Sequence, residues 1–310
     1  MIIYALNKNW LRDVRHLIRS WTMQRVLRST LAVAGHTAVI CFVWMQMLGF
    51  EKMALDSFIF SLLGVVLSVL LSFRTTTAYD RWWDGKKAWG ELVNNCRNLA
   101  IYVHSTLPKD DKKSRAFFAV YISNFCIALR DHLKDGANVN ELIGLNENEK
   151  QELSAKSHIP ASIASSITNG VQDAYQAKLI SNEGHLNIKI HSQELVNVLG
   201  ICERIKKKPI RFSYNVYLKL FITLYTVCLP CALMPVSGYC SILMVAFVFF
   251  AFVGLELTAE EIEDRFGLDC NDLPIGDIAH TIKKNVFEIL ETRHTQKEEP
   301  KEIYSKVFNL

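Results

Sequence analysis

Residues 57–90 read SFIFSLLGVVLSVLLSFRTTTAYDRWWDGKKAWG. Residues 57–73 carry no charge, and the apolar run stops at Phe73 and Arg74. A tryptophan pair, Trp82 and Trp83, follows shortly after. Membrane spans end in this way at the headgroup layer, where basic and aromatic side chains concentrate. The stretch therefore predicts a membrane-spanning helix that ends near Phe73 and is followed by a polar turn.

The overall composition indicates a mixed protein rather than a bundle wholly embedded in lipid. Of the 310 residues, 50% are hydrophobic, yet 21% are charged. This balance predicts a few spans and a sizeable water-facing part. The net charge of +4 is too small to indicate nucleic-acid binding. The first 28 residues hold several basic side chains and no apolar core, so no secretory signal is expected.

Four apolar segments are long enough to cross a bilayer, which takes about 17 to 25 residues. They are 29–50, 57–73, 216–236 and 239–257. Nearly all Lys and Arg lie outside the two short connections within each pair of spans. By the positive-inside rule, both termini and the middle of the chain then face the cytoplasm. The predicted organisation is an amino-terminal arm (1–28), spans one and two (29–73), a cytoplasmic helical region (74–214), spans three and four (215–258) and a carboxy-terminal segment (259–310).

The middle region is too long to be a loop and has no alternating strand pattern. Helical patterns cover 92–103, 114–133 and 187–206, and another helix begins near Pro160 with Ser162 as its possible cap. Residues 182–185 have the composition of a turn. The predicted fold class is therefore all-α.

A ridge of the second span carries Val65, Val69 and Phe73 at spacing i, i+4, i+8. Several copies around an axis would form stacked apolar rings, which stop ions by dewetting. Ordinary helix packing explains the same spacing, and the spacing alone favours packing. Gly64 and Ser68 would allow a close approach between neighbouring helices.

The sequence carries no catalytic motif: neither a nucleophile elbow, a phosphate loop nor a metal-spaced histidine pair is present. We therefore expect no enzyme activity and no cofactor. The nine histidines are dispersed, and only His36, inside a span, is kept as a weak functional candidate. Cys228 and Cys231 have redox spacing, but they lie within a span and are interpreted as buried apolar residues. An acidic cluster at 256–272 could bind a hard cation, although a solvated face explains it better.

Three segments together resemble the bestrophin family, including its bacterial branch. They read SFRTTTAYDRWWDGKKAWGELVNNCR at 72–97, VLGICERIKKKPIRFSY at 198–214 and LTAEEIEDRFGLDCNDLP at 257–274. The resemblance implies a homopentamer of all-helical subunits, with four spans each, around one pore in the bacterial inner membrane. It also implies that Val65, Val69 and Phe73 form the apolar neck, which reverses the preference for simple packing.

The same resemblance implies a second constriction at the cytoplasmic exit, at Leu195, with Glu194 beside it. A ring of five carboxylates there would favour cations. Animal members of the family also hold calcium in an acidic clasp. Only Asp269 and Asp272 remain of that clasp here, so no tight calcium dependence is expected.

The sequence thus predicts a pentameric channel that conducts monovalent ions, cations in preference to anions such as chloride. Its expected partners are further copies of itself, the lipid bilayer and monovalent ions, and not nucleic acid. Two alternatives stay open at this point. A secondary transporter would show saturable flux coupled to a proton gradient. A membrane scaffold would form oligomers and pass no ions.

Overall fold

The computed structural model describes residues 21–47, 56–134, 136, 138–207, 212–263, 266–267 and 272–292. Within these ranges every regular element is a helix and no strand occurs, which confirms the all-α prediction. The elements are α2 (Trp21–Met47), α3 (Ser57–Thr106), α4 (Lys112–Leu133), the 3-10 helix η1 (Val139–Glu141), α5 (Glu147–Ser154), α6 (Ile159–Gln176), α7 (Asn182–Lys207), α8 (Phe212–Ser237), α9 (Cys240–Glu263) and α10 (Ile275–Ile289).

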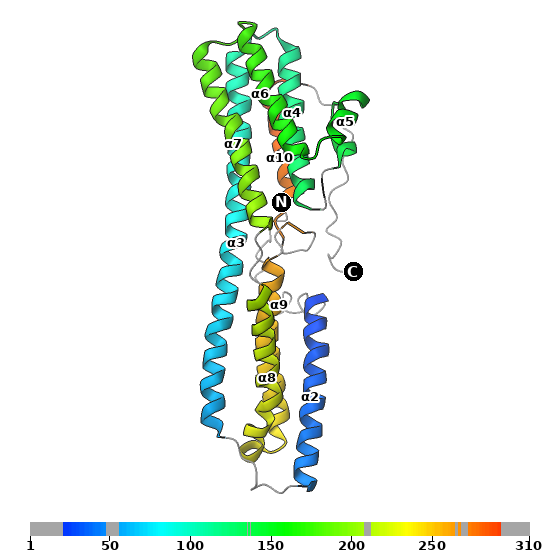
Figure 1. The fold of residues 1–310 in the computed structure, drawn as a ribbon, viewed down its shortest axis with the longest axis vertical. Helices are drawn as coiled ribbons and strands as arrows, with labels where there is room; N and C mark the ends of the chain where they lie inside the picture. Colours follow the sequence, from blue (N-terminus) through cyan, green and yellow to red (C-terminus); the bar gives the residue numbers. More distant parts are fainter. Residues whose placement is uncertain are drawn as a thin grey trace.

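The helices form two bundles stacked end to end, which gives the protomer an elongated shape (Figure 1). One bundle holds α2, α8, α9 and the first part of α3, and the other holds α4, α6, α7, α10 and the rest of α3. The four helices α2, α3, α8 and α9 are long and apolar enough to cross a membrane. These are the four helices that hydropathy predicted. We call the first group the membrane bundle and the second the polar bundle.

Helix α3 does not stop at Phe73, and the predicted polar turn is absent. It runs for 50 residues from Ser57 to Thr106. At about 1.5 Å per residue it is about 75 Å long, far more than the roughly 30 Å core of a bilayer. The hydroxyls of Thr75 and Thr77 donate to the carbonyls of Leu71 and Phe73, at 2.9 and 2.8 Å, so the polar side chains are satisfied within the helix. At residues 73 and 74 the helix therefore continues without a break, and what changes there is its side chains, from apolar to more polar.

Each bundle has its own apolar core. The polar bundle packs around Trp89, which is completely buried with Leu92 and Phe125 beside it in the same cluster. The membrane bundle packs a smaller cluster in which Leu67 of α3 meets residues of α8 and α9.

Gly64 allows a close approach between helices, as predicted. A Cβ atom there would lie 2.8 Å from the Tyr225 hydroxyl of α8, so any larger residue would displace that hydroxyl. The same hydroxyl donates to the carbonyl of Phe60, at 3.3 Å. Ser68 instead donates to its own helix, to the carbonyl of Gly64 at 2.8 Å.

Two local predictions in the middle region were wrong. Residues 182–185 are not a turn but the first turn of α7, where the Ser181 hydroxyl accepts from the Gly184 N–H at 3.1 Å. The cap of α6 is His158 rather than Ser162, because the His158 side chain accepts from the Ala161 N–H at 3.3 Å. The helix predicted at 114–133 is confirmed as α4.

Candidate functional site

The predicted neck residues share the outer face of α3 in the membrane bundle. Val65, Val69 and Phe73 are 59%, 47% and 64% exposed in the protomer. Leu67 and Leu71, on the other face of the helix, are buried against α8 and α9. Large apolar side chains exposed on this scale need lipid or another copy of the chain to cover them. The ridge is therefore placed where neighbouring copies can meet, and its role as a neck stays a prediction.

Exposure alone does not single out α3, because α8 and α9 expose apolar side chains as well. Leu220 of α8 and Phe247 of α9 are 61% and 70% exposed. What distinguishes α3 is its continuation: among the described membrane helices it is the one that extends into the polar bundle (Figure 1). Beyond Phe73 the helix exposes polar side chains, among them Thr76, Asp80 and Asn94. It also exposes Trp83 and Ile101, so the face is mixed there rather than purely apolar.

An ion-pair cluster joins α3 to the end of α9 where the two bundles meet. The Arg74 guanidinium donates to a Glu263 carboxylate oxygen at 2.6 Å, and Arg81 lies 3.6 Å from the other oxygen. The Arg74 side chain is only 1% exposed. Tyr214 at the start of α8 donates to the carbonyl of Leu70, at 3.1 Å. The aromatic and basic stretch at 74–83 therefore clamps the span to the end of α9 through Arg74 and Arg81.

The tryptophans of this stretch have different surroundings. Trp89 is buried in the core of the polar bundle, and Trp82 packs against that core. Trp83 is 51% exposed. The ammonium of Lys86 lies over both Trp82 and Trp83, at 5.1 and 5.3 Å from the ring centres. These contacts place one exposed cation over two aromatic faces.

The predicted exit constriction at Leu195 is wrong. Leu195 is 0% exposed and belongs to the core of the polar bundle, so it cannot line an opening between copies of the chain. Glu194 is half-buried, and its carboxylate accepts from the Asn197 amide at 3.1 Å. The apolar side chains that α7 does expose include Leu186, at 52%, and Ile190, at 54%.

The other residues singled out in the sequence are the calcium-clasp remnant, His36 and the cysteine pair. Of the calcium-clasp remnant, Asp272 is buried at 8% exposure, and Asp269 lies outside the described residues. His36 is exposed on α2. Cys228 and Cys231 are both free thiols on α8. Among those that the structure describes, none lies on α3.

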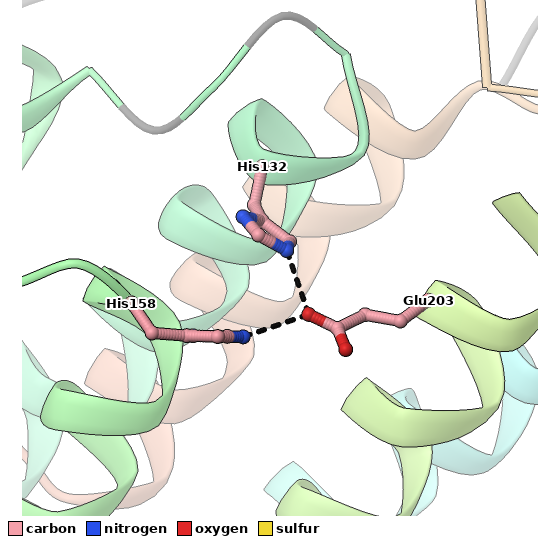
Figure 2. Close-up of side chains that lie close together, drawn as sticks. All are labelled: His132, His158 and Glu203. Carbon is pink, nitrogen blue, oxygen red and sulfur yellow. Dashed lines mark hydrogen bonds and ion pairs between the residues drawn. The ribbon is translucent and has the colours of Figure 1, made fainter. Parts of the chain in front are cut away.

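One polar cluster was missed by the sequence analysis. His132 of α4, His158 at the start of α6 and Glu203 of α7 converge, with each imidazole Nε2 at 2.7 Å from the same Glu203 oxygen (Figure 2). Glu203 lies 71 and 45 residues from its two partners, so no local spacing signals the contact. Burial raises the pKa of the Glu203 carboxyl, but hydrogen bonds from His158 and His132 outweigh it, and the pKa is lowered overall.

Comparison with known proteins decides the family. The family model described as bacterial/fungal bestrophin protein matches residues 1–288. The chain belongs to the bestrophin family. A relative from Nostoc, named a voltage-dependent anion channel-forming protein, is 34% identical over 73% of this chain and 75% of its own length. A protein of the same name from Escherichia coli K12 is 30% identical over 74% of this chain and 75% of its own.

Solved structures agree with this assignment. A bacterial bestrophin homologue from Klebsiella pneumoniae, solved by Zn-SAD phasing, superposes with a TM-score of 0.81 at 26% identity, covering 87% of this chain and all of the other. A point variant of the Klebsiella homologue gives a TM-score of 0.80 at 26% identity, covering 85% of this chain and 98% of the other. This bestrophin therefore shares the fold of solved homologues, and its family and named relatives point to an ion channel rather than an enzyme.

Proposed function

We propose that this bestrophin forms a homopentameric channel in which five α3 helices surround one pore for monovalent ions. The observation that carries the proposal is the outer face of α3, which is apolar in the membrane bundle and exposes polar side chains such as Thr76, Asp80 and Asn94 beyond Phe73. Val65, Val69 and Phe73 would then form three successive apolar rings, a constriction that gates by dewetting. The polar part of the face would line a wider, water-filled cavity.

The proposed orientation places the polar bundle in the cytoplasm of a bacterium and the membrane bundle in its inner membrane. Basic residues support it, because 74–214 and both ends of the chain hold nearly all Lys and Arg, whereas the short connections at the other end of the membrane bundle hold almost none. Both termini would then lie in the cytoplasm.

We propose that the channel conducts cations in preference to anions, because of the charged residues next to the neck. Between Phe73 and Gly85, both arginines pair with Glu263, whereas Asp80 and Asp84 are exposed. Five copies of two exposed carboxylates would lie between the neck and the exposed Lys86 and Lys87, and carboxylate rings at that position favour cations. This argument takes the place of the carboxylate ring predicted at Glu194, a half-buried side chain that accepts from Asn197. The alternative, a preference for anions, is favoured by the names of the relatives.

Reversal potentials across planar bilayers test the sign of the permeant ion. With a tenfold NaCl gradient, the current through an ideally cation-selective pore reverses at the sodium equilibrium potential, about 59 mV in magnitude. We expect the wild type to lie on that side, and the double variant Asp80→Asn, Asp84→Asn to shift toward zero by tens of millivolts. Glu152→Gln, an exposed carboxylate of α5, is the matched control and should leave the potential unchanged. Reversal on the chloride side in the wild type would show an anion channel instead.

A further inference from the structure

We propose that His132, His158 and Glu203 form a binding site for a transition-metal dication of the Zn²⁺ type, unrelated to the pore lining. The three side chains come from α4, the start of α6 and α7, and point toward one another (Figure 2). One ligand atom from each lies within 4.8 Å of the other two. Two imidazole nitrogens with one carboxylate oxygen are a donor set that Zn²⁺ uses, at bond lengths of about 2.0 to 2.2 Å.

The site leaves room for a fourth ligand from solvent. The side chains of His132, His158 and Glu203 are 26%, 36% and 19% exposed, so one side of the cluster faces water. Three protein ligands and one open position describe a tetrahedral Zn²⁺ site completed by water. Because the three helices already hold the donors together, little additional ordering is needed when the ion binds.

The donors already face one another, although one of them must change its proton. Glu203 accepts from both imidazoles at 2.7 Å, so its oxygen lies beside the two nitrogens that would share the ion. His158 accepts from the Ala161 N–H through Nδ1, at 3.3 Å, which leaves its proton on Nε2. A bound ion would replace the proton on Nε2. The imidazole would then carry its proton on Nδ1, which could no longer accept from the Ala161 N–H and cap α6. The cap is long for a hydrogen bond, so this loss is small.

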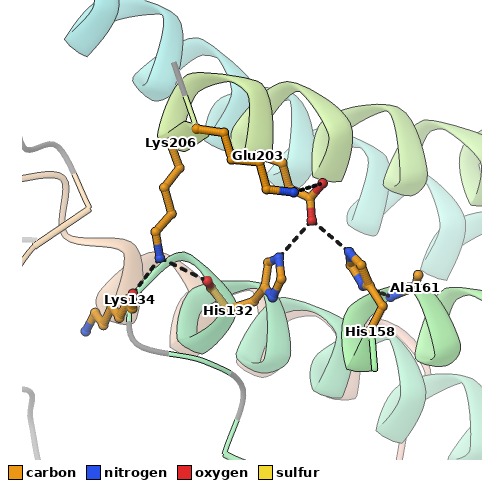
Figure 3. A network of polar contacts seen from close by, with 7 residues as sticks. His132, Lys134, His158, Ala161, Glu203 and Lys206 are labelled. Carbon is orange, nitrogen blue, oxygen red and sulfur yellow. Dashed lines mark hydrogen bonds and ion pairs between the residues drawn. The ribbon is translucent and has the colours of Figure 1, made fainter. Parts of the chain in front are cut away.

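Two lysines near the cluster have different effects. Lys206 donates to the carbonyls of His132 and Lys134, at the end of α4, and so ties α7 to α4 beside the site (Figure 3). The Lys207 ammonium lies 3.5 Å from the second Glu203 oxygen and competes with any cation. Lys207 is 71% exposed and can move into solvent. Its removal should therefore strengthen metal binding.

The position of the site gives it a possible effect on the channel. Glu203 is in the last turns of α7, and only residues 208–211 separate that helix from membrane helix α8. An ion bound here would fasten the end of α7 to α4 and α6, and so restrain the point from which α8 starts. This consequence rests on the proposed channel function, whereas binding itself does not.

Titration of the full-length protein in detergent with Zn²⁺, and with Co²⁺ as a spectroscopic probe, tests the site. We expect saturable Zn²⁺ binding of one ion per chain, and d–d absorption bands of tetrahedral Co²⁺. His132→Asn, His158→Asn and Glu203→Gln should each weaken binding by at least about tenfold, since even the partners of metal ligands contribute that much. Lys207→Met should strengthen it.

His185→Asn is the matched control, because His185 stacks on Tyr175 outside the cluster. If the control weakens binding as much as the cluster variants do, or if the wild type binds no better than they do, the site does not exist. If a cluster variant fails to fold, Lys207→Met still tests the site. Zn²⁺ affinity that does not increase in Lys207→Met contradicts the proposal. Zn²⁺ binding in a protein that passes no ions would overturn the channel proposal and leave the metal site intact.

Discussion

Replacing Phe73 with alanine is expected to raise ion flux into reconstituted liposomes by about tenfold. The exposed ring of Phe73 is the widest of the three proposed neck side chains, and five copies would be removed at once. Truncation widens the constriction and admits water, which lowers the dewetting barrier. A barrier lowered by about 1.4 kcal/mol gives a tenfold faster crossing. Val69→Ala should act in the same direction with a smaller effect, because less of the side chain is lost.

Phe247→Ala is the matched control for this experiment. Phe247 of α9 is 70% exposed, close to the 64% of Phe73, but lies on a helix that the proposal places away from the pore. Its truncation should leave the flux unchanged. If Phe73→Ala and Val69→Ala both give wild-type flux, the neck is assigned to the wrong residues.

The second large effect is expected at the junction of the bundles. Glu263→Ala removes the carboxylate that lies 2.6 Å from the Arg74 guanidinium, which is 1% exposed and loses its hydrogen-bonded ion-pair partner. Removing one partner of a buried pair costs about 3 to 5 kcal/mol. We expect a large fall in the midpoint of thermal unfolding of the purified protein. The double variant Arg74→Met, Glu263→Gln should recover much of this loss, since it removes both charges together.

An exposed ion pair supplies the control for the junction. Glu152 of α5 lies 4.0 Å from Lys156, and both side chains are more than half exposed, at 76% and 52%. Such pairs contribute about 0 to 1 kcal/mol, so Glu152→Ala should hardly change the midpoint. If Glu263→Ala is as mild as Glu152→Ala, the cluster does not hold the two bundles together.

The fold was largely predictable from the sequence because lipid imposes a strong rule on it. Backbone groups in the bilayer must be satisfied within helices, so hydropathy located all four membrane helices. The continuation of α3 was missed because a change from apolar to polar residues was interpreted as a break in the helix. Gly184 was interpreted as part of a turn, but a Cβ there would lie 3.0 Å from the Thr106 methyl, so its small size serves packing.

The candidate sites were less predictable. Leu195 was assigned from the family resemblance, although Ile188, Leu195 and Cys202 recur at intervals of seven residues, the spacing of a buried helix face. That periodicity in the sequence already argued for burial. The cluster of His132, His158 and Glu203 had no such signal, because only the packing of α4, α6 and α7 brings it together.

The central claim is that five α3 helices surround a single pore. A cryo-electron microscopy map of the full-length protein in lipid nanodiscs tests it most directly. We predict five copies around one axis, with α3 innermost and the side chains of Val65, Val69 and Phe73 directed at the axis. A monomer, or an assembly whose axis is lined by α8 or α9, would contradict the claim.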